Sequence, residues 1–274
     1  MKRIIYIIVL CCSCLQLSAQ TYDELITRAM DAVEKDSLYQ AEEWFKKALQ
    51  LEPANMRNAL LFSNLGTVQR RMGKNKEALE SYSLALNLTP YSVTMLLNRA
   101  SLYLEMDYLD KAFVDYCNVI DLDATNTEAL GFRAYIYMRR RQYTDAKADY
   151  QRVLKEVSDD KTARIGMAMA NQKLQRYRES LEEFNRLIVD YPKDVSLLKA
   201  RAELEVEMGT LEVALLDLEN AAKLAPNDEE IYVMCGEIYL AQGRKREAYV
   251  AFEKAIELGV PRPQLQEQLK ASKK

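Results

Sequence analysis

The chain has 274 residues, of which 49% are apolar and 29% are charged, so both a packed core and a solvated surface are available. Only 8 Gly and 6 Pro are present, which argues against an all-β chain with many tight turns. The formal net charge of −3 gives no reason to expect a nucleic-acid partner, since phosphate binding needs a concentrated basic face.

Residues 1–19 have the pattern of a secretory signal peptide. Lys2 and Arg3 form a short positive segment, and an almost wholly apolar stretch follows over residues 4–17. This stretch is too short for a comfortable membrane span, and Ala19 offers a small residue for cleavage. We therefore expect the protein to be exported.

Cysteines in the same segment leave two alternatives to simple cleavage open. Bacterial lipoproteins are lipidated on a cysteine just after such an apolar core, and Cys12 and Cys14 stand there. Their surroundings depart from the usual motif, since Leu10 is bulky and Cys11 replaces an aliphatic residue. Cleavage near Ala19 is the main prediction. Lipidation at Cys12 or Cys14, which would make the membrane a partner, and an uncleaved anchor stay open.

A repeated motif organises the rest of the chain. An Ala-x3-aromatic-x2-small pattern begins at Ala41, and from Ala78 to Ala248 its first residue returns every 34 residues. A fixed period of this length is typical of helical arrays. The first positions of the seven copies are Ala41, Ala78, Ala112, Ala146, Ser180, Ala214 and Ala248.

Each copy also has an apolar pattern upstream, clearest at Phe62-x2-Leu65-Gly66. The spacing in both halves predicts two amphipathic helices per repeat. A small residue where the helices cross allows close approach of their backbones, and the aromatic residue of the motif fills the space beyond.

Turn residues separate the predicted helices. A residue that tolerates positive φ ends the first helix of each repeat at low cost. The residues at this place are Gly73, Gly209 and Gly243, with Asp36, Asp107, Arg141 and Gln175 in the other repeats. Proline cannot continue a helix, and the ends of four second helices are marked by Pro53, Pro90, Pro192 and Pro226.

The whole pattern resembles the tetratricopeptide repeat (TPR) family, which has an aromatic, a Leu-Gly pair, a Tyr, then Ala, Phe or Tyr, Ala and Pro at fixed offsets. The resemblance covers residues 22–262 and departs at the Leu-Gly pair at Arg99-Ala100, Arg133-Ala134 and Arg201-Ala202. It implies an all-α, right-handed α-solenoid of seven helix-turn-helix repeats. The expected repeats are about 22–55, 59–92, 93–126, 127–160, 161–194, 195–228 and 229–262.

A final short helix is expected over residues 263–274. Leu265 and Leu269 share one of its faces, and lysines lie at its end. Each helix pair alone has too little apolar surface to fold, so repeats stack and the last one needs such a capping helix.

Residues that carry common chemistry are missing. The sequence has no histidine, the commonest general base and metal ligand, and no Gly-rich phosphate loop or nucleophile elbow. We therefore expect no enzyme, with no catalytic residue, metal or cofactor. Cys117 and Cys235 lie too many repeats apart for a disulfide and are expected to be free.

The resemblance implies that the first helices of the repeats build the inner wall of a groove, with side chains at fixed offsets pointing into it. The apolar residues at these offsets are Leu97, Leu104, Phe132, Tyr135, Met138, Ile165 and Met169. Exposed apolar surface rich in Met suits a partner site, although the same stripe is also consistent with packing between repeats. On this face Gly131 and Gly166 are expected to leave a slot for a ligand backbone.

Charge along the predicted groove is uneven. The basic residues are Arg70, Arg71, Arg139 and Lys173, and the acidic residues, in the last two repeats, are Glu203, Glu207, Glu230 and Glu237. A partner segment with a matching gradient would be oriented by it. The Lys-Asn pair with which chaperone-binding TPR proteins clamp a carboxylate is missing, because Lys199 is followed by Glu203 at the Asn offset.

We therefore expect an exported TPR scaffold or adaptor, in the bacterial periplasm or at the cell surface, that binds a peptide segment or helix of an unidentified partner protein. One alternative is a lipid-anchored TPR subunit of an outer-membrane assembly complex. Another, from a different class, is a glycan-binding helical-repeat protein that uses aromatic residues such as Phe132 and Tyr135.

Overall fold

The computed structural model describes residues 21–273, so the predicted signal peptide with Cys12 and Cys14 lies outside the described residues. Within that range every regular element is a helix. The chain divides into two compact units between Asp115 and Tyr116, and each is described by itself. We number the helix pairs repeats one to seven from α1–α2 onward, and we call the first helix of each repeat its A helix and the second its B helix.

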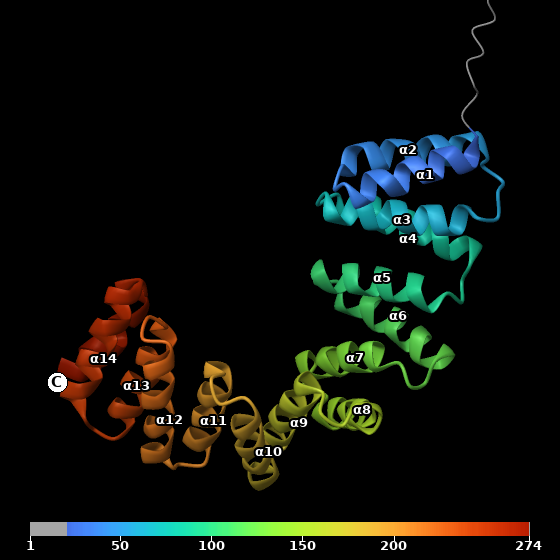
Figure 1. Cartoon of the computed structure of the whole chain (residues 1–274). Helices are drawn as coiled ribbons and strands as arrows, with labels where there is room; N and C mark the ends of the chain where they lie inside the picture. Colours follow the sequence, from blue (N-terminus) through green and yellow to red (C-terminus); the bar gives the residue numbers. More distant parts are fainter. Residues whose placement is uncertain (1–20, 274) are drawn as a thin grey trace, which may run out of the picture. The chain divides into compact units, whose positions relative to one another are not determined.

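Unit one is built from antiparallel helix pairs. Its helices are α1 (Tyr22–Glu34), α2 (Leu38–Leu51), α3 (Asn58–Arg71), α4 (Asn75–Leu88), α5 (Val93–Glu105) and the start of α6 (Leu109–Leu122). The two helices of a pair lie against each other, and α2 packs on α3 and α4 on α5, as Figure 1 shows. Phe45 and Leu65 belong to one buried cluster that joins the first two repeats.

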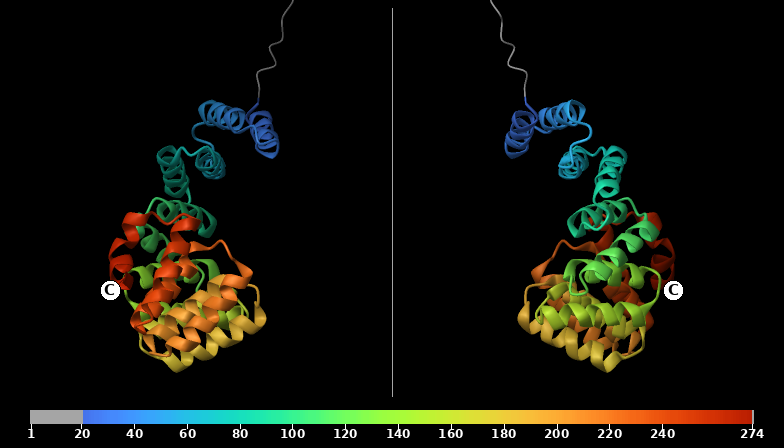
Figure 2. Two further views of the ribbon diagram at one scale, coloured as in Figure 1. Left: turned by 90° about the vertical axis from the view of Figure 1, so that its left-hand side faces the viewer. Right: turned by 90° about the vertical axis from the view of Figure 1, so that its right-hand side faces the viewer.

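Unit two continues with the same arrangement. Its complete helices are α7 (Thr127–Arg139), α8 (Tyr143–Glu156), α9 (Lys161–Lys173), α10 (Tyr177–Asp190), α11 (Val195–Glu207), α12 (Leu211–Leu224), α13 (Glu229–Ala241), α14 (Lys245–Leu258) and α15 (Gln266–Lys273), the last preceded by a 3-10 turn at Arg262–Leu265. Each B helix packs on the next A helix along the chain, and the views in Figure 2 agree with this order.

The residues that define the motif form the core. The alanines of the motif and its large residues Phe45, Tyr82, Phe184, Leu218 and Phe252 are fully buried. Burying one such side chain contributes roughly 1.5–3 kcal/mol. The prediction of an all-α array of helix pairs is therefore confirmed, and the periodic small and large residues are its cause.

The turns between paired helices also confirm the sequence prediction. Gly73, Gly209 and Gly243 have φ values of 75°, 80° and 73°, and the four other turn residues have φ values of 55–59°. At Gly73 the next amide, Lys74 N–H, donates to the Gln69 carbonyl at 2.9 Å, which closes the helix end. The four second helices that precede a proline each end two residues before it.

The C-terminal helix caps the last repeat as expected. Leu265 and Leu269 are buried and join the cluster of Phe252 on α14. Lys270 and Lys273 lie in the last turn of α15, where cations complement the helix dipole.

The departures from the Leu-Gly pair are explained by ion pairs. In each of these repeats the arginine donates hydrogen bonds from two nitrogens to an aspartate 16 residues later, on the B helix of the same repeat. The arginines are Arg99, Arg133 and Arg201. The aspartates are Asp115, Asp149 and Asp217, and all six N–O distances are 2.6–2.8 Å. These hydrogen bonds raise the pKa of each arginine.

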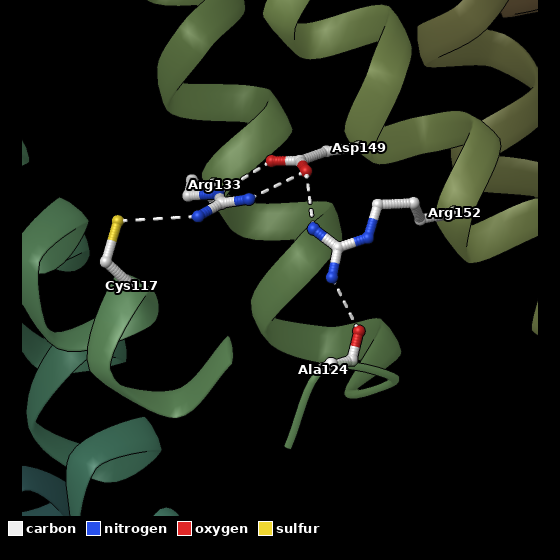
Figure 3. Close-up of polar contacts among 5 residues, drawn as sticks. All are labelled: Cys117, Ala124, Arg133, Asp149 and Arg152. Atoms are coloured by element: carbon white, nitrogen blue, oxygen red, sulfur yellow. Dashed lines mark hydrogen bonds and ion pairs between the residues drawn. The ribbon is translucent and has the colours of Figure 1, made fainter. Parts of the chain in front are cut away.

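A third nitrogen of each arginine reaches back to the preceding B helix. Figure 3 shows this for Arg133, whose Nη1 donates to Cys117 Sγ at 3.5 Å. Arg152 also contacts Asp149 at 3.4 Å and donates to the Ala124 carbonyl at 2.7 Å. The arginine therefore fills the furrow between neighbouring B helices, the space that Leu occupies in the family pattern.

Candidate partner-binding face

The A helices of repeats four and five expose three large apolar side chains. Phe132, Tyr135 and Met169 are 38%, 41% and 42% exposed. They are exposed because the opposite sides of α7 and α9 carry the buried residues that hold the helices in the array, such as Leu130 and Ala168. This face of unit two therefore offers apolar surface to water, which marks a candidate partner site.

Two of these rings are held in place by neighbours. Phe132 stacks on Tyr116 with ring centres 5.5 Å apart and an angle of 17° between the planes. The Tyr135 hydroxyl accepts a hydrogen bond from Arg139 Nη1 at 3.0 Å, and the Arg139 guanidinium lies 5.9 Å from the Tyr135 ring. Side chains that are already ordered lose less entropy when a partner binds.

Two other predicted residues on this face are less accessible to a partner. Met138 and Ile165 are partly buried, and Ile165 packs against the buried cluster that includes Ala168. Part of the apolar stripe therefore packs between repeats.

The two glycines on this face have different roles, and the prediction of a slot is wrong at Gly166. A Cβ atom at Gly166 would lie 2.3 Å from the ring of Tyr150, so the chain's own tyrosine fills this place. Burial raises the pKa of Tyr150 to about 12. At Gly131 a Cβ atom would meet nothing within 4 Å, so only this glycine leaves open space.

An acidic recess lies on α11, α12 and α13. It has a volume of about 340 Å³, and its lining includes the predicted residues Glu203, Glu207 and Glu237. Lys173 pairs with Glu207 at 3.1 Å. Desolvation raises the pKa of Glu203, and the Glu230 and Glu207 carboxylates raise it further. A cation from a partner would relieve this repulsion.

Sequence reasoning missed the apolar part of the recess. Val206 and Met234 line it together with the carboxylates. They stand at the positions that Met138 and Phe132 hold in repeat four, displaced by multiples of the 34-residue period. Extending the same offsets to apolar residues of the last two repeats would have found them.

In unit one the predicted site residues lie on α3 and α5. Arg70 pairs with Glu105 through Nε at 3.0 Å, which raises its pKa, and Arg71 pairs with Asp36 at 2.6 Å. Leu97 and Leu104 are partly buried. Exposed ion pairs of this kind contribute little stability, so a partner carboxylate can replace either acid at small cost.

The described part of the chain offers neither a metal-binding cluster nor a membrane-spanning helix. Residues 21–273 contain no group of three or more Cys, Asp or Glu side chains arranged to hold a metal ion. None of the helices in this range is both long and apolar enough to cross a membrane. Cys117 and Cys235 are free, as predicted.

Helix pairs in series, with apolar and charged side chains exposed on their A helices, define a helical-repeat interaction scaffold. Models of the tetratricopeptide repeat match residues 60–92, 93–126, 133–195 and 229–258, together more than half of the chain. The chain belongs to the tetratricopeptide repeat family, whose domains typically bind protein or peptide partners.

Known proteins agree with this assignment. A tetratricopeptide repeat protein of Parabacteroides merdae is 38% identical, with a TM-score of 0.72 over 93% of this chain and 100% of that one. YrrB, described as a TPR protein with an unusual peptide-binding site, is 18% identical, with a TM-score of 0.55 over 72% of this chain and all of YrrB. Human DnaJ homolog subfamily C member 7 is 24% identical over 64% of this chain, which spans 37% of that protein's length.

Proposed function

We propose that this protein is an exported scaffold that binds a peptide segment or helix of a partner protein on the A-helix face. The observation that carries this proposal is the exposed cluster of Phe132, Tyr135 and Met169 on α7 and α9. Aromatic and Met side chains that are exposed yet ordered are typical anchors of protein interfaces.

Charges on the A helices of unit two suggest how a partner is oriented. In unit two, Arg139 lies beside the apolar cluster, while Glu203 and Glu237 line the acidic recess. A partner with apolar side chains and a basic residue would match the cluster and the recess. Such charge matching affects orientation and association rate more than affinity.

The test is the affinity of two variants for a partner captured at this face. A photo-crosslinking residue in place of the exposed Glu128, one turn before Phe132 on α7, identifies the partner in the native host by mass spectrometry, and titration with the purified partner follows. We expect Tyr135→Ala and Met169→Asp each to weaken binding by about tenfold or more, because each removes a central anchor.

Matched controls come from exposed loop residues of unit one. Tyr91→Ala and Met56→Asp make the same chemical changes at side chains that are 79% and 91% exposed. Both should leave binding unchanged. Undiminished binding by Tyr135→Ala and Met169→Asp, or binding of a host polysaccharide in place of a protein, would contradict the proposal.

We also propose that the mature protein resides in the bacterial periplasm or at the cell surface. The support is the pattern of residues 1–19, a short positive segment followed by an apolar stretch and Ala19. Mass spectrometry of the mature N-terminus should find a chain that begins near Gln20. An acylated Cys12 or Cys14 would instead identify a lipid-anchored protein, as expected for a subunit of an outer-membrane assembly complex.

A further inference from the structure

The furrow between neighbouring B helices is filled differently from repeat to repeat. In repeats three, four and six it is filled by an arginine that forms an ion pair with an aspartate. Arg28 holds the corresponding position in repeat one, which no described B helix precedes, and its guanidinium lies 5.2 Å from the ring of Trp44, again 16 residues later. Repeats two and five carry Leu65 and Met167 at the corresponding position.

Repeat seven has neither partner of the ion pair. Cys235 stands at the arginine position, and Ala251 stands at the aspartate position. Both side chains are short, so the furrow between α12 and α14 is left unfilled. A pocket of about 600 Å³ lies there, which is within the range of pockets that bind ligands.

The floor of this pocket, which we call the α12–α14 pocket, is apolar. It is lined by Leu218, Tyr232, Cys235, Tyr239, Val250 and Ala251. Burial raises the pKa of Cys235 to about 11, so its thiol is neutral at physiological pH. An apolar group entering the pocket therefore meets no charge at its base.

Charges of opposite sign stand at the rim. Glu219 comes from α12, and Arg246, Glu247 and Lys254 come from α14. Within the described residues neither Glu219 nor Arg246 has an oppositely charged group within ion-pair distance, whereas Lys254 pairs with Glu257 at 3.3 Å and Glu247 pairs with Arg244 at 3.1 Å. Glu219 on α12 can therefore pair with a basic residue of a partner, and Arg246 on α14 can pair with an acidic one.

We propose that the α12–α14 pocket binds a large aliphatic or aromatic side chain of an amphipathic segment of a partner protein, with a basic residue of that segment facing Glu219 and an acidic residue facing Arg246. The chain itself supplies Leu65 and Met167 at the corresponding place in two other repeats, so an apolar side chain suits this position. An incoming arginine is a poorer match, because Ala251 offers no carboxylate for a forked ion pair.

This pocket is separate from the A-helix face. Its walls are the B helices α12 and α14, with α13 at its floor, and none of its lining residues belongs to the exposed cluster on α7 and α9 or to the acidic recess. The inference therefore does not depend on the proposed function, and it gives unit two a second binding surface.

Fragments of a partner side chain test the pocket directly. We expect N-acetyl-phenylalaninamide and N-acetyl-leucinamide to shift the NMR signals of residues around Cys235, with dissociation constants on the order of 1 mM. N-acetyl-argininamide should bind at least about tenfold more weakly, because the floor of the pocket is apolar. A stronger response to the arginine derivative would overturn the proposal.

The decisive variant fills the pocket with the Arg–Asp pair that other repeats of this chain carry. Cys235→Arg combined with Ala251→Asp copies the pair of repeats three, four and six, so the protein is expected to fold. It should abolish binding of both apolar amides. If this variant fails to fold, Cys235→Leu, which copies Leu65 of repeat two, replaces it. Unchanged binding by the folded variant would place the fragments elsewhere and refute the proposal.

A synthetic helical peptide tests the partner segment itself. The peptide carries one central Phe with a Lys on one side and a Glu on the other, and its control carries Ala in place of the Phe. The full chain should bind the Phe peptide at least about tenfold more tightly than the control, since one anchor side chain dominates such contacts. Glu219→Lys combined with Arg246→Ala should weaken binding of the Phe peptide to the chain. Equal binding of both peptides, or no effect of these two changes, would rule out the proposed segment.

Discussion

Repeats four and seven, both in unit two, have the same pair of helices but differ in the furrow between their B helices. In repeat four Arg133 and Asp149 fill the furrow, and Arg152 adds a second contact to Asp149. In repeat seven the corresponding residues are Cys235 and Ala251, and the furrow holds the pocket. The alanine and aromatic positions of the motif set where the helices lie, and they leave the chemistry of the furrow free to differ.

The largest effect in this comparison is expected from removing the buried acid of repeat four. Asp149 is only 3% exposed and accepts hydrogen bonds from two guanidinium groups. Asp149→Ala leaves Arg133 in a confined site without its anion. We expect the free energy of unfolding to fall by about 3–5 kcal/mol, measured by urea denaturation.

A double replacement separates the ion pair from the packing. Arg133→Leu combined with Asp149→Ser gives repeat four the residues that repeat two has at Leu65 and Ser81. Replacing both partners of a buried ion pair is often nearly neutral, so stability should return to within about 1 kcal/mol of the parent. A double variant as unstable as Asp149→Ala would mean that repeat four cannot accept the packing of repeat two.

The sequence predicted the parts of the fold that depend on local or periodic signals. The ends of the B helices before proline and the capping leucines follow from one residue type at one place, and the turn residues of positive φ follow from their fixed place in the 34-residue period. The sequence shows the arginines of the furrow only as departures from the family pattern, because each one pairs with an aspartate 16 residues later on another helix. The recurrence of Arg and Asp at that distance in three repeats was a usable signal.

The candidate site was less predictable than the fold. Gly131 and Gly166 are the same residue type on neighbouring A helices, yet only Gly166 is covered, because Tyr150 packs onto it. Offsets along a helix do not tell which neighbouring side chain reaches a given position. In the same way the sequence indicated acidic residues in the last repeats, but not that Val206 and Met234 lie among them in a recess.

A second difference between repeats four and seven is the small residue at the helix crossing. Repeat four has Ala134 there, and repeat seven has Gly236, where a Cβ atom would lie 2.4 Å from the ring of Phe252. Gly236→Ala should therefore lower the free energy of unfolding by about 1–3 kcal/mol, because the buried ring must shift. Urea denaturation measures the loss.

The control for this change is a glycine with free space. Gly131→Ala adds the same methyl group to the interior of α7, where nothing lies within 4 Å, and should raise stability by about 0.5–1 kcal/mol through helix propensity. If both substitutions stabilise the protein, close packing at Gly236 is not what distinguishes the crossing in repeat seven.

The smallest expected effect concerns the turns of the same two repeats. Arg141 ends the A helix of repeat four with φ of 59°, whereas Gly243 does so in repeat seven with φ of 73°. A side chain in this left-handed conformation is strained, so Arg141→Gly should relieve strain, although glycine also makes the unfolded chain more flexible. We expect a net gain of roughly 0.5 kcal/mol, seen as a small rise in Tm, and a loss of similar size for Gly243→Arg. Opposite signs for the two changes would show that strain at this turn outweighs chain entropy. A loss for Arg141→Gly would show that the flexibility of the unfolded chain decides the balance.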